Sequence, residues 1–203
     1  MGARSAYIFV VANDIYHWHP RRLSERLIYD EGALDAFLDE VVTKAWHFQH
    51  DAGRPFAETS AELASLHPQH ADLIALWGPE FNQTLPGPIE GMPEIVADLD
   101  ARGVPIYGIT NFSGEFWPPF RDREAALFDR FRDIVVSGDE GLVKPDPAIY
   151  ALALKRFGLA GPDAVFVDDV PANVEAAAAA GIHALLFTDA PSFRAELERL
   201  GLL

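Results

Sequence analysis

Two adjacent carboxylates stand where a short apolar run ends. Asp168 and Asp169 directly follow Val165, Phe166 and Val167, and Lys144 lies upstream of them in a Lys-Pro-Asp-Pro segment. Carboxylates that follow a strand of a parallel sheet are typical ligands of a divalent cation, and a nearby ammonium group suits an anion held on that cation. These residues therefore predict a site for a cation and an anionic ligand.

The first predicted strand, residues 7–12, should end at the same edge of the sheet, but it contains no carboxylate. Thr110 and Asn111 follow a second predicted strand, residues 104–109, and provide a hydroxyl and an amide. Such donors bind phosphoryl oxygens, and Lys144 neutralises their charge. The set describes a phosphoryl-transfer site that lacks its nucleophile.

Hydrophobic spacing predicts the elements that position these groups. Between about residues 20 and 82 the pattern is helical, with one apolar stripe over residues 34–45 and further helices over residues 21–29, 58–66 and 68–81. After Pro88, strands alternate with helices, and the predicted strands are residues 104–109, 134–136, 165–167 and 184–187. This order predicts an α/β fold with a doubly wound, Rossmann-like parallel sheet and an inserted α-helical cap.

Domain boundaries follow from the same pattern. The segment from Leu85 to Pro88 is rich in proline and glycine, which is typical of a connection. We expect residues 1–16 and 87–203 to form the α/β core and residues 17–86 to form the helical cap. A chain of 203 residues with 49% hydrophobic content is long enough for both.

The amino-acid composition limits the classes of binding partner and the cellular location that we expect for this protein. A net charge of −15 disfavours nucleic acid and anionic membrane surfaces as partners, because binding to polyanions depends on clustered Lys and Arg. No apolar run reaches the roughly 20 residues of a membrane span. The chain has no cysteine, which excludes a thiol nucleophile and fits a cytoplasmic location. We expect a small anionic metabolite as the ligand, and the oligomeric state stays open.

The chain resembles the haloacid dehalogenase superfamily over nearly its whole length. Ile109-Thr110-Asn111 is similar to the second family motif, residues 144–150 to the third, and residues 165–173 to the fourth. The segment from Trp18 to Arg22 resembles the cap entry of the subgroup with a small helical cap, which includes sugar-phosphate phosphatases and 2-haloacid dehalogenases. The resemblance implies a hydrolase that cleaves a small phosphomonoester with Mg²⁺ through an aspartyl phosphate.

The resemblance also implies roles for individual residues. Thr110, Asn111 and Lys144 would bind substrate, with Lys144 also catalytic. Mg²⁺ would be held by Asp168, Asp169 and the backbone carbonyl of Ala12.

The first motif departs from the family pattern. Val10 stands at the position of the nucleophilic aspartate, and Ala12 stands at the acid/base position. A valine side chain cannot attack phosphorus. Loss of a nucleophile has cost on the order of a millionfold in rate, about 8 kcal/mol of barrier. The expectation is therefore an inactive or severely impaired hydrolase with a weakened magnesium site.

Other interpretations stay open. The chain is alternatively a non-catalytic homologue that binds a metabolite or a protein, or a 2-haloacid dehalogenase-like hydrolase, a class that needs no cation. Asp14 is either a substitute nucleophile or a turn or capping residue, and Asp169 is either a ligand or a cap for the next helix. His17, His19, His47 and His50 are expected to be solvated or packing residues rather than metal ligands.

Overall fold

The computed structural model describes residues 6–9 and 14–203, and within them the chain forms a five-stranded parallel sheet. The strand order is β3-β2-β1-β4-β5, so the order reverses at β1. The strands are β1 (Ala6–Phe9), β2 (Ile106–Thr110), β3 (Asp133–Val136), β4 (Ala164–Asp168) and β5 (His183–Leu186). The predicted strand over residues 7–12 thus begins one residue earlier, and its last three residues lie outside the described part.

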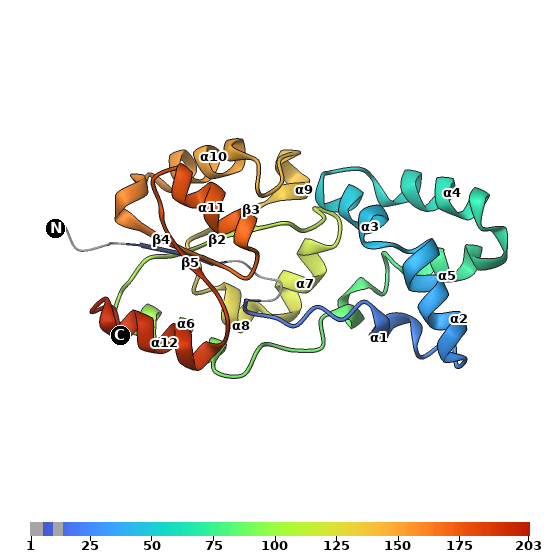
Figure 1. Ribbon diagram of the computed structural model, residues 1–203, viewed down its shortest axis with the longest axis horizontal. Helices are drawn as coiled ribbons and strands as arrows, with labels where there is room; N and C mark the ends of the chain where they lie inside the picture. The colour runs from blue at the N-terminus through green and yellow to red at the C-terminus, as the bar shows by residue number, and fades with distance from the viewer. Residues whose placement is uncertain (1–5, 10–13) are drawn as a thin grey trace.

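Helices cover both faces of the sheet, which explains why the central strands are apolar on both sides (Figure 1). Tyr7 and Phe9 pack with α6 (Met92–Ala101), α8 (Ala125–Phe128) and α12 (Ala190–Arg199). Ala6 and Ile8 point to the opposite face and pack with α10 (Pro147–Phe157) and α11 (Pro171–Ala179). The predicted doubly wound α/β fold is confirmed.

Shorter elements complete this part of the molecule. They are α7 (Trp117–Arg123), α9 (Ser137–Glu140) and the 3₁₀ turn η4 (Gly161–Asp163). Of these, α9 lies directly after β3, at the same edge of the sheet as the predicted site.

A group of helices between β1 and β2, here called the helical segment (residues 21–84), extends to one side of the sheet in Figure 1. Its elements are α1 (Arg21–Ser24), α2 (Glu31–Ala36), the π-helix η1 (Phe37–Val41), α3 (Lys44–Asp51), α4 (Phe56–Leu66), η2 (Pro68–His70), α5 (Ala71–Leu76) and η3 (Phe81–Thr84). In the described residues, no helix has the length and apolar character needed to cross a membrane.

The helical segment is more interrupted than the sequence pattern predicts. One helix was expected over residues 34–45, but η1 ends at Val41 and a new helix, α3, begins at Lys44. Thr43 separates them, because its side chain accepts a hydrogen bond from the Trp46 backbone N–H at 3.1 Å and so caps α3. The expected helix over residues 68–81 likewise divides into η2, α5 and η3. An apolar stripe continued across these breaks and hid them.

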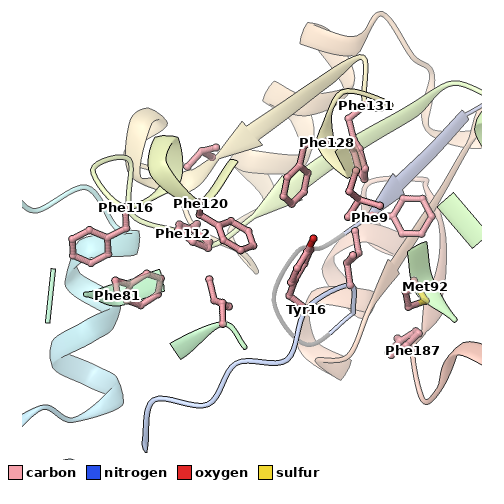
Figure 2. Packing of buried hydrophobic residues seen from close by; sticks show 14 of the residues in the cluster. Phe9, Tyr16, Phe81, Met92, Phe112, Phe116, Phe120, Phe128, Phe131 and Phe187 are labelled. Atoms are coloured by element: carbon pink, nitrogen blue, oxygen red, sulfur yellow. The ribbon is translucent and has the colours of Figure 1, made fainter. Parts of the chain in front are cut away.

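Aromatic packing joins the sheet to the helical segment. In Figure 2 the rings run from Phe9, through Tyr16, to Phe120, and on to the rings beside the helical segment. Tyr16 and Phe120 have ring centroids 5.0 Å apart, and Phe81 lies 4.9 Å from Phe116. These residues belong to one continuous buried cluster. The helical segment therefore shares the core of the sheet.

The helical segment approaches the sheet closely at Gly138 in α9. A Cβ atom there would lie 2.4 Å from the backbone nitrogen of Gly114 and 3.1 Å from the backbone oxygen of His50. Beside it, the Ser137 hydroxyl donates a hydrogen bond to the backbone oxygen of Asp51 at 2.5 Å. The end of α3 is thus fixed against α9 and the loop after β2.

We predict that Gly138→Ala destabilises the protein by about 1–3 kcal/mol, because the new methyl group meets backbone atoms that cannot rotate away. The matched control is Gly87→Ala, where an added Cβ has no atom within 4 Å, and there we expect a change within about 0.5 kcal/mol. Urea unfolding of both variants measures the difference. Equal stability of the two would contradict the close contact.

Candidate functional site

The candidate site lies where the strand order reverses. In doubly wound sheets, ligands bind outside the carboxyl ends of the strands at this point. Here β1 pairs in parallel with β2 on one side and with β4 on the other. The residues that end or follow these strands are Thr110, Asp168 and the turn that contains Asp14. The topology therefore brings Thr110, Asp168 and Asp14 to the same edge of the sheet.

A buried ion pair forms the centre of the site. The Lys144 ammonium donates to Oδ2 of Asp168 at 2.8 Å, and the two residues are only 3% and 0% exposed. Asp168 Oδ1 also accepts from the backbone N–H of Val170 at 2.8 Å. The Asn173 amide nitrogen contacts both Asp168 oxygens, at 3.0 and 2.9 Å. Lys144 is thus a site residue and not a surface lysine.

The side chain of Asn111 holds the Lys144 backbone in place. Its amide nitrogen donates to the Lys144 carbonyl at 3.0 Å, and its oxygen accepts from the Lys144 N–H at 2.8 Å. This paired contact links the end of β2 to the loop before α10. In this structure the Asn111 amide positions Lys144, and its direct binding to substrate stays a prediction.

Thr110 and Asp169 also reach the predicted place. The Thr110 side chain is fully buried, and its hydroxyl has no hydrogen-bond partner among the described residues. Asp169 is partly exposed beside Asp168. The N-cap position of α11 belongs to Val170, so Asp169 does not occupy the capping position considered for it.

Asp14 lies in the turn after β1 and is fully buried. Neither of its carboxyl oxygens has a partner of ordinary hydrogen-bond geometry within the described residues. Burial raises the pKa of Asp14 well above its usual value, the charges of Asp168 and Asp169 add to this, and Lys144 opposes it. Asp14 is therefore in a turn, as one interpretation held, but inside the site. Val10 and Ala12 lie outside the described residues.

Asp51, at the end of α3, is a site residue that the sequence analysis missed. It is 8% exposed, and burial raises its pKa to about 7 although the backbone amide of Ser113 and the charge of Lys144 lower it. The ring of His47 lies one helical turn away, with Nε2 at 3.7 Å from Oδ1 of Asp51. The sequence did contain a signal for Asp51. It is an acidic residue on the apolar face of a helix that also carries Trp46 and His47.

The histidines pack or face solvent, as expected. The Trp77 indole N–H donates to His47 Nδ1 at 3.2 Å, so the neutral His47 ring carries its proton on Nε2, toward Asp51. His50 Nε2 lies 2.6 Å from the Thr59 hydroxyl. Burial lowers the pKa of His47 to about 3 and of His50 to about 4, which keeps both rings neutral. His17 and His19 are exposed.

The oxygen atoms at the candidate site determine whether it can bind a divalent cation. In the described part of the chain, no three His, Cys, Asp or Glu side chains converge closely enough to enclose a metal ion. Mg²⁺ in phosphoryl-transfer sites, however, uses one or two carboxylates together with water and substrate oxygens. The buried oxygens of Asp14 and Thr110, which lack partners within the described part of the chain, fit such an open site together with the carboxylate of Asp168.

We predict that Lys144→Met destabilises the fold by about 3–5 kcal/mol, because it leaves the buried Asp168 carboxylate without its counter-charge. The double variant Lys144→Met with Asp168→Asn should lose much less than the sum of the two single changes. Urea unfolding of all three variants gives the coupling. Simple additivity would show that the pair does not interact in solution.

A pH dependence follows from Asp51. Because its pKa rises from 3.8 to about 7 on folding, the protonated form stabilises the fold fully below 3.8, and this stability is lost as pH rises through about 7. Asp51→Asn, which stays neutral at every pH, should therefore gain stability relative to the parent as the pH rises from about 4 to about 7. The control is Asp122→Asn, at an exposed position in α7. Parallel stability curves for parent and Asp51→Asn would refute the assignment.

Comparison with known proteins shows to which family this chain is similar. Residues 12–181 match the family model for haloacid dehalogenase-like hydrolases. The chain is 28% identical to the sesquiterpene phosphatase AstK of Aspergillus oryzae, over 96% of this chain and 95% of that protein. It is 34% identical to acyl-CoA dehydrogenase family member 10 of Mus musculus, over 84% of this chain but only 15% of the much longer mouse protein.

A solved structure shares the fold. The magnesium complex of a HAD family enzyme from Bacteroides thetaiotaomicron superposes with a TM-score of 0.71 at 17% identity, covering 98% of this chain and 100% of that one. The family match spans most of the chain, and the motif residues lie together at the point where the sheet order reverses. The protein belongs to the haloacid dehalogenase-like hydrolase family.

Proposed function

We infer that this chain binds a small phosphomonoester in the crevice beside Asp168, and that it hydrolyses the ester very slowly or not at all. One observation carries the binding half of this proposal. The buried pair of Lys144 and Asp168 lies at the same edge of the sheet as a Thr110 hydroxyl that lacks a partner among the described residues. Such an arrangement costs stability unless a ligand uses it.

Each binding residue has a distinct part. Lys144 provides positive charge for phosphoryl oxygens, and Thr110 donates a hydrogen bond to one of them. Asn111 fixes the position of Lys144 through its two hydrogen bonds to the Lys144 backbone. The phosphatase activity in the name of the Aspergillus oryzae relative supports a phosphomonoester as the ligand class.

The proposed cofactor is Mg²⁺, held by Asp168, by Asp169 and by the backbone carbonyl of Ala12. When bound, it would supply positive charge for the phosphoryl oxygens. Asp168 would share its carboxylate oxygens between the cation and the Asn173 amide nitrogen, which contacts both of them. The magnesium complex of the Bacteroides thetaiotaomicron enzyme supports this choice.

The missing step is the attack on phosphorus. Covalent catalysis by a carboxylate needs a side chain at the end of β1 that can form a bond to phosphorus, and Val10 has none. The remaining groups stabilise charge but do not replace the nucleophile. Loss of the nucleophile costs on the order of a millionfold where the catalytic groups act as a unit.

The helical segment belongs to the proposal as a cap. We assign residues 17–86 to the cap and residues 1–16 and 87–203 to the α/β core. The contact at Gly138 brings the end of α3 against the core, and Asp51 arrives there within the influence of the Lys144 charge. The cap would thus exclude water from the crevice, which strengthens the electrostatic interactions in it.

Asp14 supports a second candidate, an active hydrolase with Asp14 as nucleophile, because it is buried inside the site. One argument weighs against it. Asp14 lies four residues past Val10, and attack on phosphorus tolerates little displacement of the reacting atoms.

We predict negligible turnover by the parent chain and a gain of several orders of magnitude in Val10→Asp, because only the variant can form an aspartyl phosphate at the end of β1. Release of p-nitrophenol from p-nitrophenyl phosphate, and of chloride from 2-chloropropionate, with and without Mg²⁺, measures both family activities. Val10→Asp combined with Lys144→Ala should be inactive. Substantial activity of the parent that disappears in Asp14→Asn would make Asp14 the nucleophile.

A further inference from the structure

Asp14 is the least satisfied acidic side chain in the described structure. It is 0% exposed, and both of its carboxyl oxygens lack hydrogen-bond partners within residues 6–9 and 14–203. The backbone N–H of Asp169 approaches it and favours its charged form, but no hydrogen bond of ordinary geometry results. A buried carboxyl group costs several kcal/mol unless hydrogen bonds or an opposite charge compensate it. Its surroundings should therefore contain a compensating ligand.

The charged groups around Asp14 indicate the charge of the ligand that would compensate it. Asp168 and Asp169 both repel its ionised form, and Lys144 is the cation that attracts it. Lys144 is already paired with Asp168 at 2.8 Å. Three carboxyl groups thus share one ammonium group, so a further positive charge would compensate them. A divalent cation supplies it, whereas an anion would add to the repulsion.

We propose that Asp14 is a direct ligand of the divalent cation and supplies, from the turn after β1, the carboxylate that Val10 does not provide. The inference rests on the proposed cation site at Asp168 and assigns Asp14, in place of Asp169, as the second carboxylate of that site. In this chain the carboxylate has moved from the end of the strand to the following turn. Asp14 and Asp168 together give the one or two carboxylates that Mg²⁺ uses in phosphoryl-transfer sites.

The role of ligand suits Asp14 better than the role of nucleophile. A cation accepts oxygen ligands from several directions, and water completes its coordination. A nucleophile must instead lie in line with the bond that it breaks. The shift of four residues from Val10 to Asp14 is therefore compatible with metal binding. Thr110 and Lys144 stay available for the anion on the other side of the site.

Calorimetric titration with Mg²⁺ tests this inference on the full chain. Changes in ligands beyond the first coordination shell commonly weaken metal binding 10–100-fold, so loss of a direct ligand in Asp14→Asn should weaken it at least about tenfold. Asp122→Asn, which removes an exposed acid, should bind Mg²⁺ as the parent does. The swapped variant Val10→Asp with Asp14→Asn should recover affinity, because it returns a carboxylate to the end of β1.

The outcomes separate this inference from the proposed function. Unchanged Mg²⁺ affinity in Asp14→Asn overturns the ligand role, and so does a parent that binds no Mg²⁺. Titration with inorganic phosphate, in the parent and in Lys144→Ala, tests the anion site independently. If Asp14→Asn does not fold, carboxyl ¹³C resonances of the parent decide the question. Selective broadening of the Asp14 resonance by Mn²⁺ supports the ligand role, and an unaffected resonance overturns it.

Discussion

The buried ion pair between Lys144 and Asp168 is the constraint on which the rest of the site depends. Two opposite charges 2.8 Å apart, away from water, are stable only if their remaining hydrogen-bonding groups are satisfied. Asn173 and Val170 complete Asp168 from the start of α11, and Asn111 fixes the backbone of Lys144 from the end of β2. The pair therefore ties three separate parts of the chain to one point.

That point coincides with the place where the sheet order reverses, which explains why the surrounding groups are arranged as a binding site. Carboxyl groups arrive from the turn after β1 and from β4, and a hydroxyl arrives from β2. The helical segment adds Asp51 from a third direction, and the close contact at Gly138 holds it there. The arrangement suits an anion bridged to a cation. Under the proposed function, Val10 leaves this arrangement without a group that attacks phosphorus.

Much of this could be predicted from the sequence, because strand ends in a parallel sheet converge. The positions of Thr110, Lys144 and Asp168 followed from that rule and from the family motifs. Asp51 could not be placed in the same way, since its neighbours Ser113 and Lys144 are distant in the sequence. The break in the helix over residues 34–45 was hidden because the apolar stripe continues through it. The burial of Asp14 depends on how one turn folds back, which spacing alone does not encode.

The central claim is that the site binds phosphate but forms no covalent phosphoenzyme. Exchange of ¹⁸O between water and inorganic phosphate reports on this directly, because each reversible formation of an aspartyl phosphate releases one phosphate oxygen to water. With Mg²⁺ present, the account predicts that the parent binds phosphate without exchange and that Val10→Asp catalyses exchange. Rapid exchange by the parent, lost in Asp14→Asn, would contradict the account.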